Sequence, residues 1–182
     1  MTGIANSQVK KNIFLLAGQS NMSGLGGVVM NIWDGIVPPE CSPNPAILKL
    51  DSNLQWVEAS EPLHADIDVN VTCGIGMPFA SSLLNKTSCL GIVGLVPCAM
   101  VGNKISEWQK GTFLYNQLVT RAKAATVQGC GVIRALKKMQ QFLTDLRGDV
   151  GLPERLIIQT NLHLTASSQV LLGNMMADAF LT

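Results

Sequence analysis

Phe14-Leu-Leu-Ala-Gly-Gln-Ser-Asn-Met22 joins a short apolar run to a glycine and then to a serine. A short apolar run of this kind, in a chain rich in such runs, predicts a buried β-strand. Ser20 then lies just past the end of the strand, and active sites of open α/β sheets lie at the carboxyl ends of their strands. The stretch therefore predicts an α/β fold with a functional serine at one edge of its sheet.

Segments of strand-like and helix-like periodicity alternate along the rest of the chain. We expect strands at 13–16, 54–57, 91–97, 132–136 and 156–159, and helices at 78–85, 114–125, 136–146 and 170–180. Such alternation predicts a parallel sheet with helices on both faces. The 182 residues suit a single domain, 1–182, with a polar lead-in at 1–11.

The composition is that of a chain with a large buried core. Hydrophobic residues make up 47% and charged residues 14%, against about 25% charged in an average globular protein, and the mean hydropathy is +0.29. The net charge of +1 gives no electrostatic reason to expect a nucleic acid or an anionic membrane as partner. No apolar run approaches the length of a membrane span.

The apolar run after Lys10 and Lys11 is shorter than the core of a secretion signal, so we expect a cytoplasmic protein. The five cysteines are odd in number and widely spaced, without a C-x-x-C pair or zinc-like spacing. We expect reduced, mostly buried thiols and no metal site. The glycine-rich stretch at 23–27 lacks the ending of a phosphate-binding loop, so no nucleotide cofactor is expected.

The block Gly18-Gln-Ser-Asn-Met22 resembles the signature of the SGNH-type carbohydrate esterases of family six, which share the sialate O-acetylesterase-like domain. The plant branch is the most similar. Further matching stretches lie at 56, 61–68, 77–84, 91–108 and 162–165, followed by the last helix. The resemblance implies a flavodoxin-like three-layer α/β/α sandwich. It also implies removal of acetyl groups from sugar hydroxyls without metal or cofactor.

The same resemblance implies roles for individual residues. Ser20 corresponds to the nucleophile and His163, in Leu162-His-Leu-Thr165, to the general base. The backbone N–H groups of Ser20 and Gly102 correspond to the oxyanion hole. Positions implied to bind the acetylated carbohydrate substrate are Gln19, Asn21 and Asn103.

The chain also departs from the family pattern. Thr160 stands three residues before His163, where the family has the aspartate that orients the imidazole, and Val101-Gly-Asn103 replaces Gly-Gly-Thr. The family's Trp-Tyr-Gln-Gly-Glu-Ser segment is missing after 132–136, and a second gap falls between 159 and 162. At the first gap a strand meets a helix without the usual loop of about 2–6 residues.

These gaps predict an incomplete sheet, and they are explained by a shortened gene model, a splice variant or a decaying paralogue. The alternative to an active esterase is thus a catalytically impaired or inactive domain that binds carbohydrate or a partner. Asp66 and Asp68 are possible replacements for the absent aspartate, although nothing in the sequence places either near His163. His64 is interpreted as structural or at the rim of the pocket, and Trp108 as a core residue or a sugar-stacking one.

Overall fold

The structure is a computed structural model that describes residues 10–30, 32–127, 131–133 and 165–181. Within those residues the main sheet has five strands in the order β5-β4-β6-β1-β7. Their bounds are β1 (Lys11–Leu16), β4 (Ile47–Leu50), β5 (Trp56–Glu58), β6 (Ile92–Pro97) and β7 (Gly131–Ile133). β1 pairs in parallel with β6 and β7, and β4 pairs in parallel with β6. The expected parallel sheet is confirmed for these strands, but β5 is antiparallel to β4, so the sheet is mixed.

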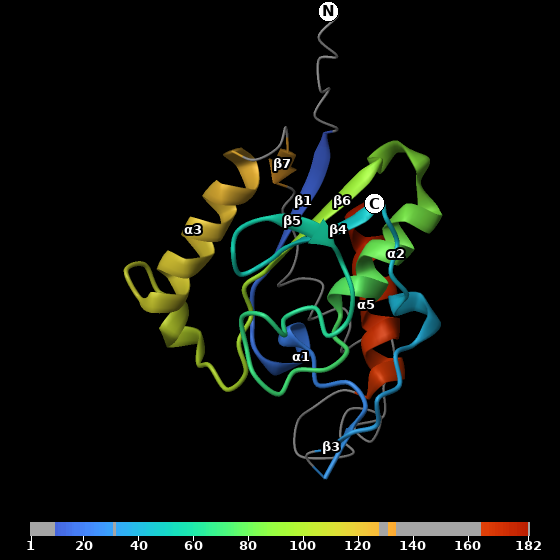
Figure 1. Cartoon of the computed structure of the whole chain (residues 1–182), viewed down its shortest axis with the longest axis horizontal. Helices are drawn as coiled ribbons and strands as arrows, with labels where there is room; N and C mark the ends of the chain where they lie inside the picture. Colours follow the sequence, from blue (N-terminus) through green and yellow to red (C-terminus); the bar gives the residue numbers. More distant parts are fainter. Residues whose placement is uncertain (1–9, 31, 128–130, 134–164, 182) are drawn as a thin grey trace, which may run out of the picture.

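Helices cover both faces of this sheet (Figure 1). α2 (Gly76–Lys86) and α5 (Ala166–Leu181) lie side by side on one face, and α3 (Phe113–Val127) lies on the other. The period-two pattern of β1 explains the two layers, because successive strand residues point to opposite faces. Phe14 belongs to the core under α2 and α5, whereas Ile13 belongs to the core under α3. The predicted three-layer α/β/α architecture is confirmed.

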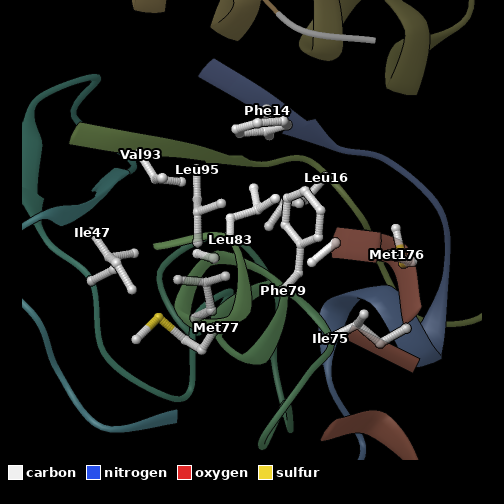
Figure 2. Packing of buried hydrophobic residues seen from close by; sticks show 14 of the residues in the cluster. Phe14, Leu16, Ile47, Ile75, Met77, Phe79, Leu83, Val93, Leu95 and Met176 are labelled. Carbon is white, nitrogen blue, oxygen red and sulfur yellow. The ribbon is translucent and has the colours of Figure 1, made fainter. Parts of the chain in front are cut away.

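The larger core lies between the sheet and the α2–α5 pair (Figure 2). Phe14 contacts Phe79 of α2 and Phe180 of α5 edge-to-face, with ring centroids 5.0 and 5.1 Å apart. Burying a side chain of this size stabilises the fold by about 2–3 kcal/mol. Strand β1, which leads to Ser20, is thereby anchored to both helices on that face.

Shorter elements connect this framework. They are α1 (Ser20–Ser23), β2 (Val28–Val29), β3 (Ile32–Trp33) and the 3₁₀ turns η1 (Pro39–Cys41), η2 (Ser88–Leu90) and η3 (Ile105–Trp108). β2 and β3 form a separate antiparallel pair. None of the helices in the described part of the chain is long and apolar enough to cross a membrane.

The predicted elements at 13–16, 54–57, 78–85, 91–97, 114–125 and 170–180 are confirmed as β1, β5, α2, β6, α3 and α5, with bounds shifted by a few residues. Of the strand expected at 132–136, the described part is β7. The helix at 136–146 and the strand at 156–159 lie outside the described residues. Sequence reasoning missed β4, a four-residue strand with Lys49 inside it, because so short a segment carries no clear periodicity.

The crossing of α5 over α2 depends on Gly173. A Cβ atom at this position would lie 2.8 Å from the Phe79 backbone nitrogen and 3.0 Å from the Ile75 carbonyl oxygen. Backbone atoms cannot move aside as a flexible side chain can. The two helices therefore reach this close packing only because the residue has no side chain.

We predict that Gly173→Ala lowers the free energy of unfolding by about 1–3 kcal/mol, the usual cost of overpacking. In an uncrowded helix the same change would stabilise the protein by about 0.5–1 kcal/mol. The sign of the change in unfolding free energy therefore distinguishes a crowded from an uncrowded site. Urea unfolding followed by circular dichroism measures this change. Leu171→Ala, on the exposed side of α5, is the control and should change stability less. A stabilised Gly173→Ala variant would contradict the close crossing.

Candidate active site

Ser20 lies at the carboxyl edge of the sheet, where β1 leads through Gly18 into α1. Gly18 has φ +144, and Ser20 is 5% exposed. The turn is closed by the Met22 N–H, which donates to the Gln19 carbonyl at 2.8 Å, and by the Gly24 N–H, which donates to the Ser20 carbonyl at 2.8 Å. The Ser20 hydroxyl and N–H make no hydrogen bond to other described residues.

The loop that follows β6, residues 98–103, lies against the turn that carries Ser20. The N–H groups of Cys98 and Ala99 both donate to the Leu16 carbonyl, at 3.0 and 2.8 Å. The Met100 N–H then donates to the Gly18 carbonyl at 3.3 Å. These bonds bring the 98–103 loop, predicted from sequence to hold the oxyanion, beside the predicted nucleophile.

Gly102 occupies the turn of the 98–103 loop with φ +80, a conformation that favours glycine. A Cβ there would meet nothing within 4 Å, so the position faces open space. Its N–H makes no hydrogen bond within the described part of the chain. The Asn103 side chain closes the turn by donating to the Met100 carbonyl at 3.1 Å, while the Val101 N–H donates to Asp68 Oδ2 at 2.7 Å.

The glycine-rich stretch after Ser20 makes a close backbone contact with residues 72–73. A Cβ on Gly24 would lie 2.3 Å from the Thr72 carbonyl oxygen, and Gly24 has φ +108. The Thr72 N–H donates to the Gly24 carbonyl at 2.9 Å, and the Gly26 N–H donates to the Cys73 carbonyl at 2.9 Å. These glycines therefore serve backbone packing around the Ser20 turn.

The start of α5 is fixed to the same place. With its amide oriented to match its neighbours, buried Gln169 donates to the Cys73 carbonyl at 2.7 Å and accepts from the Gly26 N–H at 2.9 Å. A Cβ on Gly26 would lie 3.1 Å from the Ala166 Cα. His163 lies outside the described residues, as does Thr160.

Glu61 is a half-buried residue whose carboxyl group sequence reasoning did not single out. Its Oε2 accepts from the Leu63 N–H at 2.8 Å and its Oε1 from the Gly74 N–H at 3.1 Å. Burial raises the pKa of Glu61 to about 7, although these two hydrogen bonds and Lys49 oppose the shift. The carboxyl joins the segment before His64 to the segment that packs on Gly24.

His64 is 0% exposed, and its two ring nitrogens make no well-formed hydrogen bond to the described residues. Burial lowers its pKa to about 3, outweighing the opposite effects of Asp66 and the Leu16 carbonyl. The imidazole is therefore neutral at neutral pH and lies in the interior. This supports the structural interpretation of His64 and not a place at a pocket rim.

Arg121 of α3 is buried beneath the carboxyl edge without a carboxylate hydrogen bond among the described residues. Its Nε donates to the Pro97 carbonyl at 2.7 Å, and its Nη2 and Nη1 donate to the carbonyls of Leu50 and Asp51 at 2.5 and 3.1 Å. It thus holds the ends of β6 and β4 together. Burial raises the pKa of the neighbouring Cys98 thiol to about 11 although Arg121 opposes the shift, so that thiol stays protonated at neutral pH.

The remaining residues considered from the sequence have structural contacts in the described part of the chain. Trp108 is half-buried and packs against the α3-side core, which favours the core interpretation. Asp66 forms an ion pair with Lys49 at 3.2 Å. Cys41, Cys73 and Cys98 are buried free thiols, as expected, and Cys89 is exposed. Across the described ranges no three His, Cys, Asp or Glu side chains gather where they could hold a metal ion.

We predict that His64 makes the fold acid-sensitive. Its folded pKa of about 3 lies below the ordinary value of 6.5, so the unfolded chain binds the proton first and stability falls as pH drops from about 6.5 toward 3. The stability difference between wild type and His64→Gln should shrink by about 2–5 kcal/mol across this range. Urea unfolding at pH 7, 5.5 and 4 measures the difference, and a pH-independent difference would refute the prediction.

The chain is similar to known carbohydrate esterases. The family model for carbohydrate esterases described as sialic acid-specific acetylesterase matches residues 10–162. The "Probable carbohydrate esterase At4g34215" of Arabidopsis thaliana is 35% identical, over 93% of this chain and 90% of the relative. The X-ray structure of the protein from Arabidopsis thaliana AT4G34215 superposes with a TM-score of 0.77 at 33% identity, covering 94% of this chain and 98% of that one.

The alignment with the Arabidopsis relative extends over 235 residues, whereas this chain has 182. The relative therefore carries residues without a counterpart here, which agrees with the gaps expected from the family pattern. Family membership supports a carbohydrate esterase function and implies an acetylated carbohydrate as substrate. The match to the family model, the identity and the shared fold together show that this chain belongs to the sialic acid-specific acetylesterase family of carbohydrate esterases.

Proposed function

We propose that this chain is a carbohydrate O-acetylesterase in which Ser20 is the nucleophile. The observation that carries the proposal is the position of the turn that carries Ser20 beside the 98–103 loop, at the carboxyl edge of the sheet. Two N–H groups, of Ser20 and Gly102, make no hydrogen bond within the described structure. Unoccupied backbone donors beside a nucleophile are what an oxyanion hole requires.

In the proposed reaction the Ser20 Oγ attacks the acetyl carbonyl carbon and its proton passes to the His163 imidazole. The N–H groups of Ser20 and Gly102 stabilise the negative oxygen of the tetrahedral intermediate. The intermediate collapses, the carbon–oxygen bond to the sugar breaks, and His163 returns the proton to the sugar oxygen. A water molecule, deprotonated by the same imidazole, then releases acetate from Ser20.

The order of the chain supports His163 as the base. Thr165, whose hydroxyl accepts from the Ser168 N–H at 3.2 Å, caps α5, and α5 begins against Gly26 in the loop that follows Ser20. His163 stands two residues before Thr165 in the sequence, and the resemblance to the family implies that it is the base.

The proposed activity is weak. Thr160 takes the place of the family aspartate that would orient the imidazole, and losing that carboxylate costs on the order of 10⁴ in turnover in serine proteases. Catalysis then relies on Ser20, His163 and the backbone N–H donors. When a triad member is lost, the oxyanion hole and substrate binding alone still give about 10³–10⁴ over water.

We predict that the purified chain hydrolyses p-nitrophenyl acetate and releases acetate from an O-acetylated sialic acid, and that Ser20→Ala lowers kcat by about 10–100-fold because no nucleophile remains. The control is Ser81→Ala in α2, away from the Ser20 turn, which should keep wild-type turnover. Equal turnover by wild type and Ser20→Ala, with both shown to be folded by circular dichroism, would contradict the esterase proposal.

A second candidate is a carbohydrate-binding domain without turnover, favoured by Thr160 and by the residues that the Arabidopsis relative carries in addition. In that case wild type and Ser20→Ala would bind an O-acetylated sugar equally in isothermal titration calorimetry, and neither would release acetate. Turnover that depends on Ser20 excludes this candidate.

A further inference from the structure

We propose that Asp68 is a positioning residue that sets the geometry of the proposed oxyanion hole. The proposal rests on the proposed esterase function and concerns the 98–103 loop that carries Gly102. Asp68 Oδ2 accepts from the Val101 N–H at 2.7 Å, across 33 residues of sequence. Its other oxygen, Oδ1, accepts from the Val69 N–H at 2.8 Å. The carboxylate thus joins the end of the 61–68 segment to the residue directly before Gly102.

The Val101 peptide is the part of the loop that most needs an external partner. The loop is attached at its start, where the N–H groups of Cys98 and Ala99 donate to the Leu16 carbonyl and that of Met100 donates to the Gly18 carbonyl. Beyond Met100, the one bond from the loop to another segment among the described residues is the bond to Asp68. Asn103 bonds only within the turn.

Because of the conformation of Gly102, the bond between Val101 and Asp68 affects the direction of the Gly102 N–H. Glycine at φ +80, with open space around it, has no side chain to hold the turn, so the peptide planes on either side can rotate at little cost. Fixing the Val101 N–H on a carboxylate fixes the Met100–Val101 peptide plane, from which the φ and ψ angles of Val101 set the direction of the Gly102 N–H. An oxyanion hole depends on donors that are aimed before the reaction starts.

The segment that carries Asp68 is itself held in place. The N–H groups of Ile67 and Asp68 donate to the carbonyl of buried His64, at 2.9 and 3.0 Å. Asp66 accepts from the Ser52 N–H at 2.7 Å and pairs with Lys49. A carboxylate on a segment held in this way can therefore position the turn at Gly102, and in this proposal it does so through hydrogen bonding and not through its charge.

The test uses three variants of the full chain. Asp68→Ala removes the acceptor, whereas Asp68→Asn keeps an amide oxygen that can accept from the Val101 N–H while losing the charge. Asp51→Ala is the matched control, because Asp51 also accepts a main-chain N–H, that of Gln55 at 2.7 Å, at a turn outside the 98–103 loop. Activity is measured with p-nitrophenyl acetate.

We expect Asp68→Ala to lower kcat by about tenfold to hundredfold with KM changed by less than about twofold, because misaimed donors affect the transition state more than substrate binding. Asp68→Asn should keep kcat within about threefold of wild type, and Asp51→Ala should be unchanged. A normal kcat in Asp68→Ala would overturn the proposal. So would an equal loss in Asp68→Asn and Asp68→Ala, which would point to the charge of Asp68.

A second readout separates this proposal from the proposed function. Amide hydrogen exchange, followed by NMR without substrate, should be at least about tenfold faster at Val101 in Asp68→Ala and near wild type in Asp68→Asn. If wild type shows no Ser20-dependent turnover, the esterase proposal fails while the exchange rates still decide whether Asp68 holds the loop. Unchanged exchange at Val101 in Asp68→Ala would overturn the positioning role.

Discussion

The parallel pairing of β1 with β6 is the constraint on which the candidate site depends. Its register sets Leu16 beside Pro97, so that both strands end at the same level of the sheet. The Leu16 carbonyl continues the pairing by accepting from two N–H groups of the 98–103 loop. The Ser20 turn and this loop therefore leave the sheet together, and a slip of one residue in register would turn every side chain of β1 to the opposite face.

Close approach of backbone to backbone is the second constraint, and glycine makes it possible. Gly24 and Gly26 let the Ser20 loop lie on residues 72–73, and Gly173 lets α5 cross α2. Arg121 and Glu61 add polar links between segments far apart in sequence, each by bonding to backbone groups and not to a side chain of opposite charge. Close backbone contacts and hydrogen bonds to backbone groups thus hold the carboxyl edge of the sheet in place.

The elements that sequence reasoning predicted are those with a strong local signal. β1 and β6 are apolar runs buried on both faces, and α3 and α5 show helical spacing, so their existence follows from periodicity. β4 was missed because its burial comes from its neighbours β5 and β6 and not from a pattern of its own. The family motif located Ser20 and Gly102, but the roles of Glu61, Arg121 and Asp68 are set by contacts across long stretches of chain, which spacing alone cannot reveal.

The link from Gln169 to Cys73 and Gly26 joins the last helix of the chain to a loop near its beginning. Contacts of such large sequence separation form late, because the intervening chain must first be ordered. During synthesis residues 24–73 emerge before α5, so the bond from the Gly26 N–H to the Cys73 carbonyl can form before the Gln169 amide is there to bridge the same two groups. The link to α5 is thus a late addition to a loop whose own backbone contacts with residues 72–73 can already have formed.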